Sequence, residues 1–355
     1  MRILPINPPV PPTRDVSIFL TRVSFIWNLS ISLDMMGWYY SQLFVTPPYP
    51  TKSFSEQTVI VTGSNVGLGY EAAQHFVRLG AAKVIIAVRN VAAGEKAKQS
   101  IEAAVQRTGV CEVWELDLAS FSSVKAFGAR AAQLPRLDIV VENAALAVSD
   151  FRLIEGHERQ ITINVISTIL LALLLLPKIQ ETARRFPAAE GHITIVSSEV
   201  HAWTSFPEWK APNTFAALND AEKTNMAERY GTSKLLEILA VREIAPRIAN
   251  SGVIINLVNP GLCHSALARH SGWGLWLLKQ VFARSTEVGS RTLMAGATAG
   301  QDSHGAFMSD GHVANDELSA FVRSDEGLQA QKKVWRELGE ILEQIYPGIL
   351  NVLPS

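Results

Sequence analysis

The sequence predicts an α/β fold built on a doubly wound parallel sheet, in one domain that follows an N-terminal extension. Three observations indicate this class. Short β-branched runs alternate with segments of helical periodicity from residue 57 onward. The runs are apolar at nearly every position, which is typical of strands buried on both faces. A glycine-rich turn joins the first run to the first helical segment.

The composition narrows the class further. Of 355 residues, 48% are hydrophobic and 18% charged, which excludes a disordered chain. The net charge of -1 disfavours a nucleic-acid binder, because such proteins are usually basic. Two cysteines are too few for a disulfide framework or a four-thiolate zinc site. We therefore expect a reducing compartment, either the cytoplasm or the cytoplasmic face of a membrane.

Residues 1–54 form the predicted extension. Eight of the 17 prolines lie within the first 50 residues, so the start of the chain is expected to be extended. Val16–Leu33 is apolar but carries Arg22, and an aromatic cluster at residues 38–40 follows it. Three interpretations of residues 16–44 stay open: a helix lying on a membrane surface, an arm packed on the body, and a membrane span.

The predicted domain covers residues 55–355. Strands are expected near residues 58–62, 83–88, 110–116, 137–141, 192–197 and 253–258. Helices are expected near 70–79, 92–106 and 122–132. Ile161–Leu176 is very apolar, yet its uninterrupted part is shorter than the ~20 residues that cross a bilayer. We expect it to be a helix buried by the sheet, and a homo-oligomer interface would suit it too.

The glycine-rich turn predicts a nucleotide site. It follows a strand directly and opens a helix, so backbone N–H groups at the helix start can hold a pyrophosphate. This context is that of a Rossmann-type dinucleotide fold. The residues of the turn are Gly63, Ser64, Asn65, Val66, Gly67, Leu68 and Gly69.

Arg89 follows the second strand. A carboxylate at this position would accept a hydrogen bond from an NAD ribose, whereas the arginine fork binds a 2′-phosphate. This favours NADP(H). The alternative is a solvated charge that pairs with Glu95 or with nothing.

Tyr230 and Lys234 are spaced four apart, so they share one face of a helix. A phenol titrates near ~10, and a nearby ammonium lowers its pKa toward the range of useful acid–base chemistry. Such a tyrosine can protonate a carbonyl oxygen or deprotonate an alcohol.

Together with the glycine turn, these residues resemble the short-chain dehydrogenase/reductase family. Asn143-Ala144, Ser197-Ser198 and Asn259-Pro260-Gly261 add to the resemblance, which covers about residues 55–310. Residues 197–201 and 230–235 are similar to retinol-dehydrogenase-like members. Residues 114–120 and 41–48 resemble fungal members associated with secondary metabolism.

The resemblance implies roles for single residues. Ser198 would bind the substrate oxygen, Tyr230 would be the general acid or base, and Lys234 would lower its pKa and bind ribose hydroxyls. Asn164 would hold a water for proton relay, or else cap or kink its helix. The remaining cofactor contacts implied are Asp117 and Leu118 at the adenine, Asn143 beside the strand, and Pro260, Gly261 and Ser265 near the nicotinamide.

Two residues depart from the family pattern Asn-Asn-Ala-Gly. Ala145 adds a methyl group where glycine permits close approach, which is tolerated if its φ is negative. Glu142 brings a charge that needs solvent or a partner.

Aromatic residues on both borders of the site predict a bulky apolar substrate, with ordinary loop packing as the alternative. They are Trp203, Phe206, Trp209 and Phe215 before Tyr230, and Trp273 and Trp276 in a lid expected near residues 265–285. His201 and His264 are interpreted as bystanders, and no cluster has metal-ligand spacing.

The expected function is NADP(H)-dependent interconversion of a ketone or aldehyde and an alcohol, in fungal secondary metabolism, with reduction as the cellular direction. One alternative is a membrane-associated retinol- or steroid-type dehydrogenase. Another is a nucleotide-sensing relative without turnover, although such proteins often lack the tyrosine or lysine that this chain has.

Overall fold

The computed structural model describes residues 33–187, 190–264 and 282–354. Its main feature is an eight-stranded sheet in the order β10-β9-β8-β7-β4-β1-β2-β3, parallel except for the β9–β10 pair. The strands are β1 (Thr58–Thr62), β2 (Lys83–Val88), β3 (Cys111–Glu115), β4 (Ile139–Glu142), β7 (Gly191–Val196), β8 (Val253–Asn259), β9 (Phe307–Ser309) and β10 (His312–Val313). A separate hairpin pairs β5 (Leu153–Ile154) with β6 (His157–Glu158).

Helices connect the strands and cover the sheet. The α-helices are α2 (Leu33–Phe44), α3 (Gly67–Arg78), α4 (Val91–Val105), α5 (Phe121–Ala131), α6 (Thr168–Arg185), α7 (Thr214–Leu218), α8 (Arg229–Arg247), α10 (Thr286–Gly296) and α11 (Asp325–Ile345). One segment, η1 (Ile161–Ser167), is a π-helix. The 3₁₀-helices are η2 (Glu199–Trp203), η3 (Pro207–Lys210), η5 (Gln301–Ser303), η6 (Asn315–Glu317) and η7 (Ile349–Val352).

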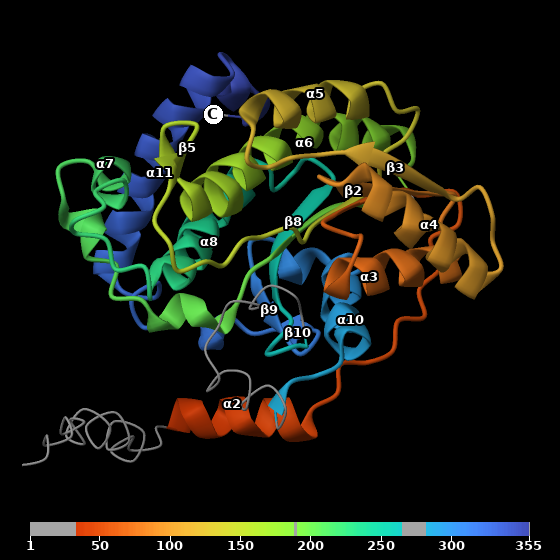
Figure 1. Ribbon diagram of the computed structural model, residues 1–355, viewed down its shortest axis with the longest axis horizontal. Helices are drawn as coiled ribbons and strands as arrows, with labels where there is room; N and C mark the ends of the chain where they lie inside the picture. The colour runs from red at the N-terminus through yellow and green to blue at the C-terminus, as the bar shows by residue number, and fades with distance from the viewer. Residues whose placement is uncertain (1–32, 188–189, 265–281, 355) are drawn as a thin grey trace, which may run out of the picture.

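The helices form one layer on each face of the sheet. Helices α3, α4 and α10 pack on one face, and α5, α6 and α8 pack on the other, with α11 beyond α8 (Figure 1). Two buried apolar clusters fill these interfaces because alternate strand residues point to opposite faces. The predicted doubly wound sheet is thereby confirmed.

The direction in which the chain crosses the sheet reverses between β1 and β4. From β1 the chain runs outward through β2 and β3, then returns to continue on the other side with β4 and β7. Ligands of such sheets bind where this direction reverses, at the carboxyl ends of the strands. The glycine turn follows β1 and Asn143 follows β4, so both lie at this point.

The apolar segment that starts at Ile161 is a core helix. Ile161–Arg185 is the one helix among the described residues that is long and apolar enough to cross a membrane, and most of its apolar part is buried in the fold. It begins as the π-helical turn η1 and continues as α6. The prediction of burial against the sheet is confirmed.

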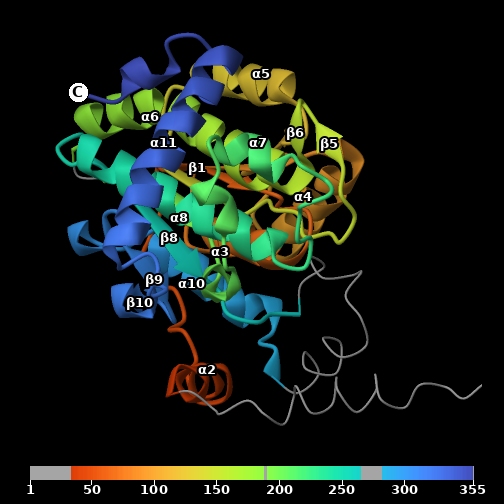
Figure 2. The same cartoon turned by 90° about the vertical axis from the view of Figure 1, so that its left-hand side faces the viewer.

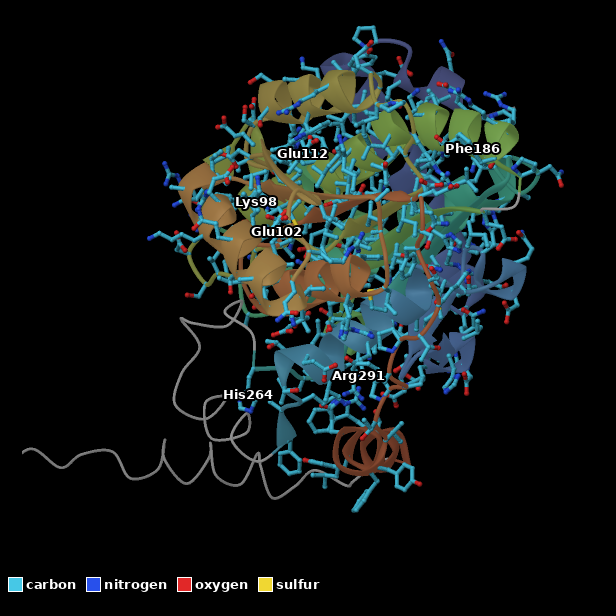
Figure 3. All side chains as sticks on the ribbon, turned by 90° about the vertical axis from the view of Figure 1, so that its right-hand side faces the viewer. Lys98, Glu102, Glu112, Phe186, His264 and Arg291 are labelled. Carbon is cyan, nitrogen blue, oxygen red and sulfur yellow. The ribbon has the colours of Figure 1, made fainter. Side chains whose placement is uncertain are left out.

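Part of the N-terminal extension packs on the body. Arg284, which is buried, donates hydrogen bonds to the carbonyl oxygens of Ser41 and Val45 and pairs with Asp310 at 2.6 Å. Arg291 on α10 donates to the carbonyl oxygen of Pro47 at 3.2 Å (Figure 3). Both cartoon views place α2 beside α10 and β10 (Figure 2). From Leu33 onward the chain therefore follows the arm interpretation, and residues 16–32 lie outside the described residues.

Candidate active site

The glycine turn is tightly closed. Gly63 and Gly67 have φ of +65° and +66°, which favours glycine. A Cβ on Gly69 would lie 2.5 Å from Asn143 Nδ2 and 2.9 Å from the carbonyl oxygen of Gly63. The Ser64 hydroxyl is buried and donates to the carbonyl oxygen of Val61 at 2.7 Å. The turn thus needs its glycines for backbone shape and close packing.

The start of α3 is open for an anion. Its N-cap residue Val66 makes no side-chain cap hydrogen bond, and the first turn carries no acidic residue. A Cβ built on Gly67 would meet no atom within 4 Å. The first N–H groups of a helix need partners and favour negative charge. This geometry fits a dinucleotide pyrophosphate, which Asn65, Val66, Gly67 and Leu68 would hold.

Asn143 ties the end of β4 to the glycine turn. Its Nδ2 donates to the carbonyl oxygen of Thr62 at 2.9 Å, and the backbone N–H groups of Asn143 and Ala144 donate to Thr62 Oγ1 at 3.0 and 2.9 Å. Ala145 does not adopt a positive φ. The methyl group that departs from the family pattern therefore brings no backbone strain.

Three other predicted cofactor residues lie at strand ends in the same half of the sheet. Arg89, after β2, is exposed and makes no ion pair with any described residue, while Glu95 pairs with Lys98. After β3, the Asp117 carboxylate accepts a hydrogen bond from the N–H of Ala119 at 3.0 Å. Leu118 is buried and its carbonyl oxygen accepts from the Ser167 hydroxyl.

The start of α8 carries Tyr230 and Lys234. A Cβ on Gly231 would lie 2.7 Å from the carbonyl oxygen of Val200, so glycine allows η2 to approach the helix closely. The Thr204 and Thr232 hydroxyls share a hydrogen bond of 2.8 Å across the same contact. Ser198, which precedes η2, is thereby held beside the face of α8 that carries the tyrosine.

Ser198 belongs to a polar chain that reaches α2. Its hydroxyl donates to Glu199 Oε2 at 3.4 Å, and Trp38 Nε1 donates to Glu199 Oε1 at 3.2 Å. Neither Glu199 nor Trp38 is among the site residues predicted from the sequence. Only their positions in the sequence could have indicated them, because Glu199 adjoins Ser198 and Trp38 belongs to the aromatic cluster of the extension.

The expected lowering of the Tyr230 pKa is not found in this arrangement. Burial first, then the carboxyl groups of Glu237 and Glu199, raise the pKa of the Tyr230 phenol. Lys234 Nζ lies 5.7 Å from the centre of the tyrosine ring, and its charge is balanced by Glu237 Oε1 at 2.7 Å. The ammonium therefore stabilises the carboxylate rather than the phenolate.

Asn164 joins three segments inside the π-helical turn η1. It is fully buried, and its side chain exchanges hydrogen bonds of 2.8 and 2.9 Å with the backbone of Leu146. Its Nδ2 also donates to Ser233 Oγ at 2.9 Å. The Asn164 side chain connects the segment after β4 to α8 and so positions the helix that carries Tyr230. This structural role is separate from the expected proton relay.

The Pro-Gly turn after β8 contacts α2. Gly261 has φ of +71°, and a Cβ there would lie 2.3 Å from Gln42 Nε2. The N–H of Leu262 donates to Gln42 Oε1 at 3.2 Å, and the carbonyl oxygen of Pro260 accepts from Cys263 Sγ. Helix α2 therefore covers the turn expected to lie near the nicotinamide. Ser265 and most of the expected lid, including Trp273 and Trp276, lie outside the described residues.

The aromatic residues before Tyr230 only partly line a substrate path. Phe206 and Phe215 are buried in the core, so for them the interpretation as substrate-lining residues is wrong and ordinary packing holds. Trp209 packs against Phe321 at 6.2 Å between ring centres. Trp203 is 66% exposed. Packing of Phe206 and Phe215 in the core is favoured because each phenylalanine removes a large apolar area from water.

Other groups near the site are structural. His201 is buried, where its Nδ1 lies 2.8 Å from the carbonyl oxygen of Ser198 and burial lowers its pKa. His264 is exposed (Figure 3). Within the described ranges, no group of three or more His, Cys, Asp or Glu side chains could hold a metal ion.

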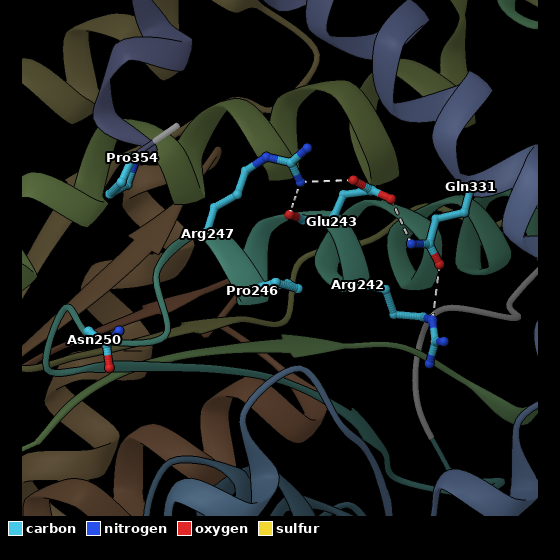
Figure 4. A pocket seen from close by; sticks show the side chains of 7 residues that line it. All are labelled: Arg242, Glu243, Pro246, Arg247, Asn250, Gln331 and Pro354. Atoms are coloured by element: carbon cyan, nitrogen blue, oxygen red, sulfur yellow. Dashed lines mark hydrogen bonds and ion pairs between the residues drawn. The ribbon is translucent and has the colours of Figure 1, made fainter.

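A hollow of about 630 Å³ lies away from this site, at the far end of α8 (Figure 4). Arg242 there follows Lys234 by eight residues, which is about 12 Å along the helix. The polar side chains that line the hollow form hydrogen bonds with one another. Gln331 accepts one from Arg242 at 3.0 Å and donates one to Glu243 at 2.7 Å. This network is satisfied by itself, so we assign the hollow no part in the chemistry.

Comparison with known proteins places the chain in a family. Residues 57–210 match the family model described as short chain dehydrogenase. The short-chain dehydrogenase anuD of Penicillium roqueforti is 44% identical over 90% of this chain and 86% of its own. A short chain dehydrogenase/reductase of Cryptosporiopsis is 48% identical over 89% of this chain and 99% of its own.

The chain belongs to the short-chain dehydrogenase family. It is therefore an oxidoreductase, and the predicted resemblance to fungal members is confirmed.

Solved structures agree with the fold. RhlG of Pseudomonas aeruginosa, in complex with NADP, matches at a TM-score of 0.57 with 22% identity, over 74% of this chain and 97% of that one. A 3-oxoacyl (acyl-carrier-protein) reductase of Agrobacterium tumefaciens with NADP bound matches at 0.56 with 19% identity, over 81% of this chain and 100% of that one.

Proposed function

We propose that this short-chain dehydrogenase interconverts a bulky apolar ketone or aldehyde and its alcohol with NADP(H), in fungal secondary metabolism. The observation that carries the proposal is the placement of Ser198, Tyr230 and Lys234 on adjoining elements next to an open α3 N-terminus. The NADP bound in the two bacterial structures and the fungal origin of the relatives support it.

When bound, NADPH supplies the hydride. Ser198 Oγ donates a hydrogen bond to the substrate oxygen and stabilises the charge that develops there. The Tyr230 phenol, which burial keeps protonated, donates its proton to the same oxygen in reduction. In oxidation Tyr230 takes that proton back. Lys234 binds ribose hydroxyls and stabilises the phenolate that reduction leaves.

Arg89 would determine the preference for the 2′-phosphate. Replacing Arg89 by Ala is expected to weaken NADPH binding about tenfold to a hundredfold, because a charge-assisted hydrogen bond is lost. NADH binding should change little, since it has no phosphate at this position. Titration of the purified protein with each dinucleotide measures both constants.

The exposed Arg323 provides the control for that experiment. An Arg323→Ala variant should bind both dinucleotides like the unmodified chain. Equal weakening of NADPH and NADH by Arg89→Ala would contradict the assigned role and leave Arg89 a solvated charge.

A second candidate is a membrane-associated dehydrogenase of the retinol or steroid type. It is favoured by a stripe on the outer side of α2, where Tyr40, Leu43 and Phe44 are 63%, 49% and 71% exposed. Residues three and four apart share a helix face, so these side chains form one apolar surface. The same helix contacts the Pro-Gly turn through Gln42.

Vesicle flotation tests this candidate. The vesicles are made of phosphatidylcholine with phosphatidylserine. A Leu43→Ser, Phe44→Ser double variant should lose at least about half of the vesicle-bound fraction, because burying these two side chains in the membrane would contribute several kcal/mol to binding. Leu328→Ser with Tyr346→Ser removes two exposed apolar groups elsewhere and serves as control. If both double variants float like the unmodified chain, α2 does not anchor the protein.

A further inference from the structure

A buried carboxyl group contacts Lys234, and a second one lies near the first. Glu237, one helical turn further along α8, is 1% exposed, and Glu142, the last residue of β4, is 4% exposed. Lys234 Nζ donates to Glu237 Oε1 at 2.7 Å and to the carbonyl oxygen of Val196 at 2.8 Å. The proposed mechanism uses Lys234 but neither acid.

Both acids lie in the same layer, between the sheet and α8. Glu142 and Val140 point to the same face of β4, and Val140 belongs to the apolar cluster that includes the side chains of α8. Glu142 is in register with Ile195, the neighbour of Val196. Among the described residues, both carboxyl oxygens of Glu142 and Glu237 Oε2 have no hydrogen-bond partner.

The charges in this layer do not balance if both acids ionise. Burial, only partly offset by Lys234, raises the pKa of Glu237 to about 7. Burial and the neighbouring Glu237 raise the pKa of Glu142 well above its ordinary value. Glu142 therefore holds its proton more strongly than an ordinary carboxyl group, and Glu237 is the acid that pairs with the ammonium.

The elements packed on α8 bring few other titratable groups to this layer. Tyr230 lies on α8 itself, and η2 brings Glu199, whose carboxylate acts on Tyr230, and His201, whose pKa burial lowers. Asn164 from η1 is neutral. A change in charge at Lys234 therefore acts first on Glu237, and Glu237 in turn acts on Glu142.

We propose that Glu237 is a positioning residue that holds Lys234 in place and takes up a proton when the cofactor draws the ammonium away. The proposal rests on the proposed function, in which Lys234 binds two ribose hydroxyls. An ammonium has three N–H groups, and two are used by Glu237 and Val196. Binding two hydroxyls therefore requires Lys234 to release at least one protein partner.

The exchange is balanced. The hydrogen bond from Lys234 Nζ to Glu237 Oε1 breaks, and hydrogen bonds from Nζ to the ribose hydroxyls form. Glu237 then stands as a buried carboxylate without a cation, which is costly. It takes one proton from water, and no covalent bond between heavy atoms changes. Lys234, released from the carboxylate, can act on the Tyr230 phenolate.

NADPH titration by calorimetry in buffers of different ionisation enthalpy tests the proposal, because it counts protons without turnover. Near pH 8 the full chain should take up close to one proton on binding. Its NADPH affinity should fall as the pH rises above about 7, by up to tenfold per pH unit. Glu237→Gln should take up almost none and bind with little pH dependence in this range.

Two further variants sharpen the test. Glu142→Gln replaces the neighbouring acid by a neutral amide and should leave the uptake close to that of the unmodified chain, because the ammonium is paired with Glu237. Glu102→Gln removes a buried carboxyl group on α4, far from Lys234 in sequence and element, and should behave like the unmodified chain (Figure 3). If Glu237→Gln does not fold, Glu237→Asp decides: its shorter side chain contacts Lys234 less closely, so its proton uptake should be smaller than that of the unmodified chain.

The outcomes separate the two proposals. If the unmodified chain binds neither NADPH nor NADH, the proposed function fails. If it binds NADPH without proton uptake at any pH from 6 to 9, or if Glu237→Gln leaves the uptake unchanged, the positioning role is overturned and Glu237 is structural.

Discussion

Replacing Tyr230 by Phe is expected to lower kcat by at least about 10²–10⁴-fold, the usual contribution of a positioned general acid. The substitution removes one oxygen and keeps the ring that lies beside Lys234 at 5.7 Å. The phenol carries the proton that the proposed mechanism transfers, and phenylalanine has none to give. NADPH binding should stay within about threefold, because the ring and Lys234 remain.

The measurement combines steady-state reduction of an apolar carbonyl substrate with a dinucleotide titration. Tyr346→Phe, an exposed tyrosine after α11, removes the same oxygen elsewhere and should leave both quantities unchanged. Loss of NADPH binding together with activity would contradict the role of Tyr230 as proton donor and indicate a structural one.

Replacing Gly69 by Ala should weaken dinucleotide binding about tenfold to a hundredfold. The new Cβ would lie 2.5 Å from Asn143 Nδ2, 2.9 Å from the carbonyl oxygen of Gly63 and 3.1 Å from the Cα of Ser64. Backbone atoms cannot move aside cheaply, and overpacking of this kind costs about 1–3 kcal/mol. The strain falls on the turn whose N–H groups would hold the phosphates.

Thermal unfolding with and without NADPH measures this effect. Gly69→Ala should lose most of the stabilisation that a ligand of the folded state adds. Gly37→Ala is the matched control, since a Cβ there meets no atom within 4 Å. A full NADPH-induced shift in Gly69→Ala would show that the turn does not hold the dinucleotide.

Much of the fold was readable because the signals are local. The apolar runs predicted six of the strands within one or two residues at most ends, since a strand buried on both faces needs an unbroken apolar segment. The glycine turn and the Tyr230–Lys234 spacing are likewise contained in a few consecutive residues. Strands β9 and β10 and helix α11 were not predicted, because short edge strands and a strongly amphipathic surface helix depend on what they pack against.

The roles of single residues were harder to predict where they depend on contacts between segments far apart in the sequence. Phe206 and Phe215 precede Tyr230 in sequence, yet the fold buries them in the core. Trp38, more than 150 residues from Glu199, reaches it across the site. Nothing in the sequence near either residue indicates this contact, because it depends on how α2 docks.

The sequence by itself determined the family and the sheet and predicted the candidate reactive side chains, since these depend on residue types at short spacing. Only the tertiary structure decided the charge state around Lys234. Glu142 and Glu237 stand 95 positions apart in the chain and come near each other only because β4 and α8 share one layer of the core. Burial between those elements removes water from both carboxyl groups, and it is this loss of solvent that turns two ordinary acids into a site for a proton.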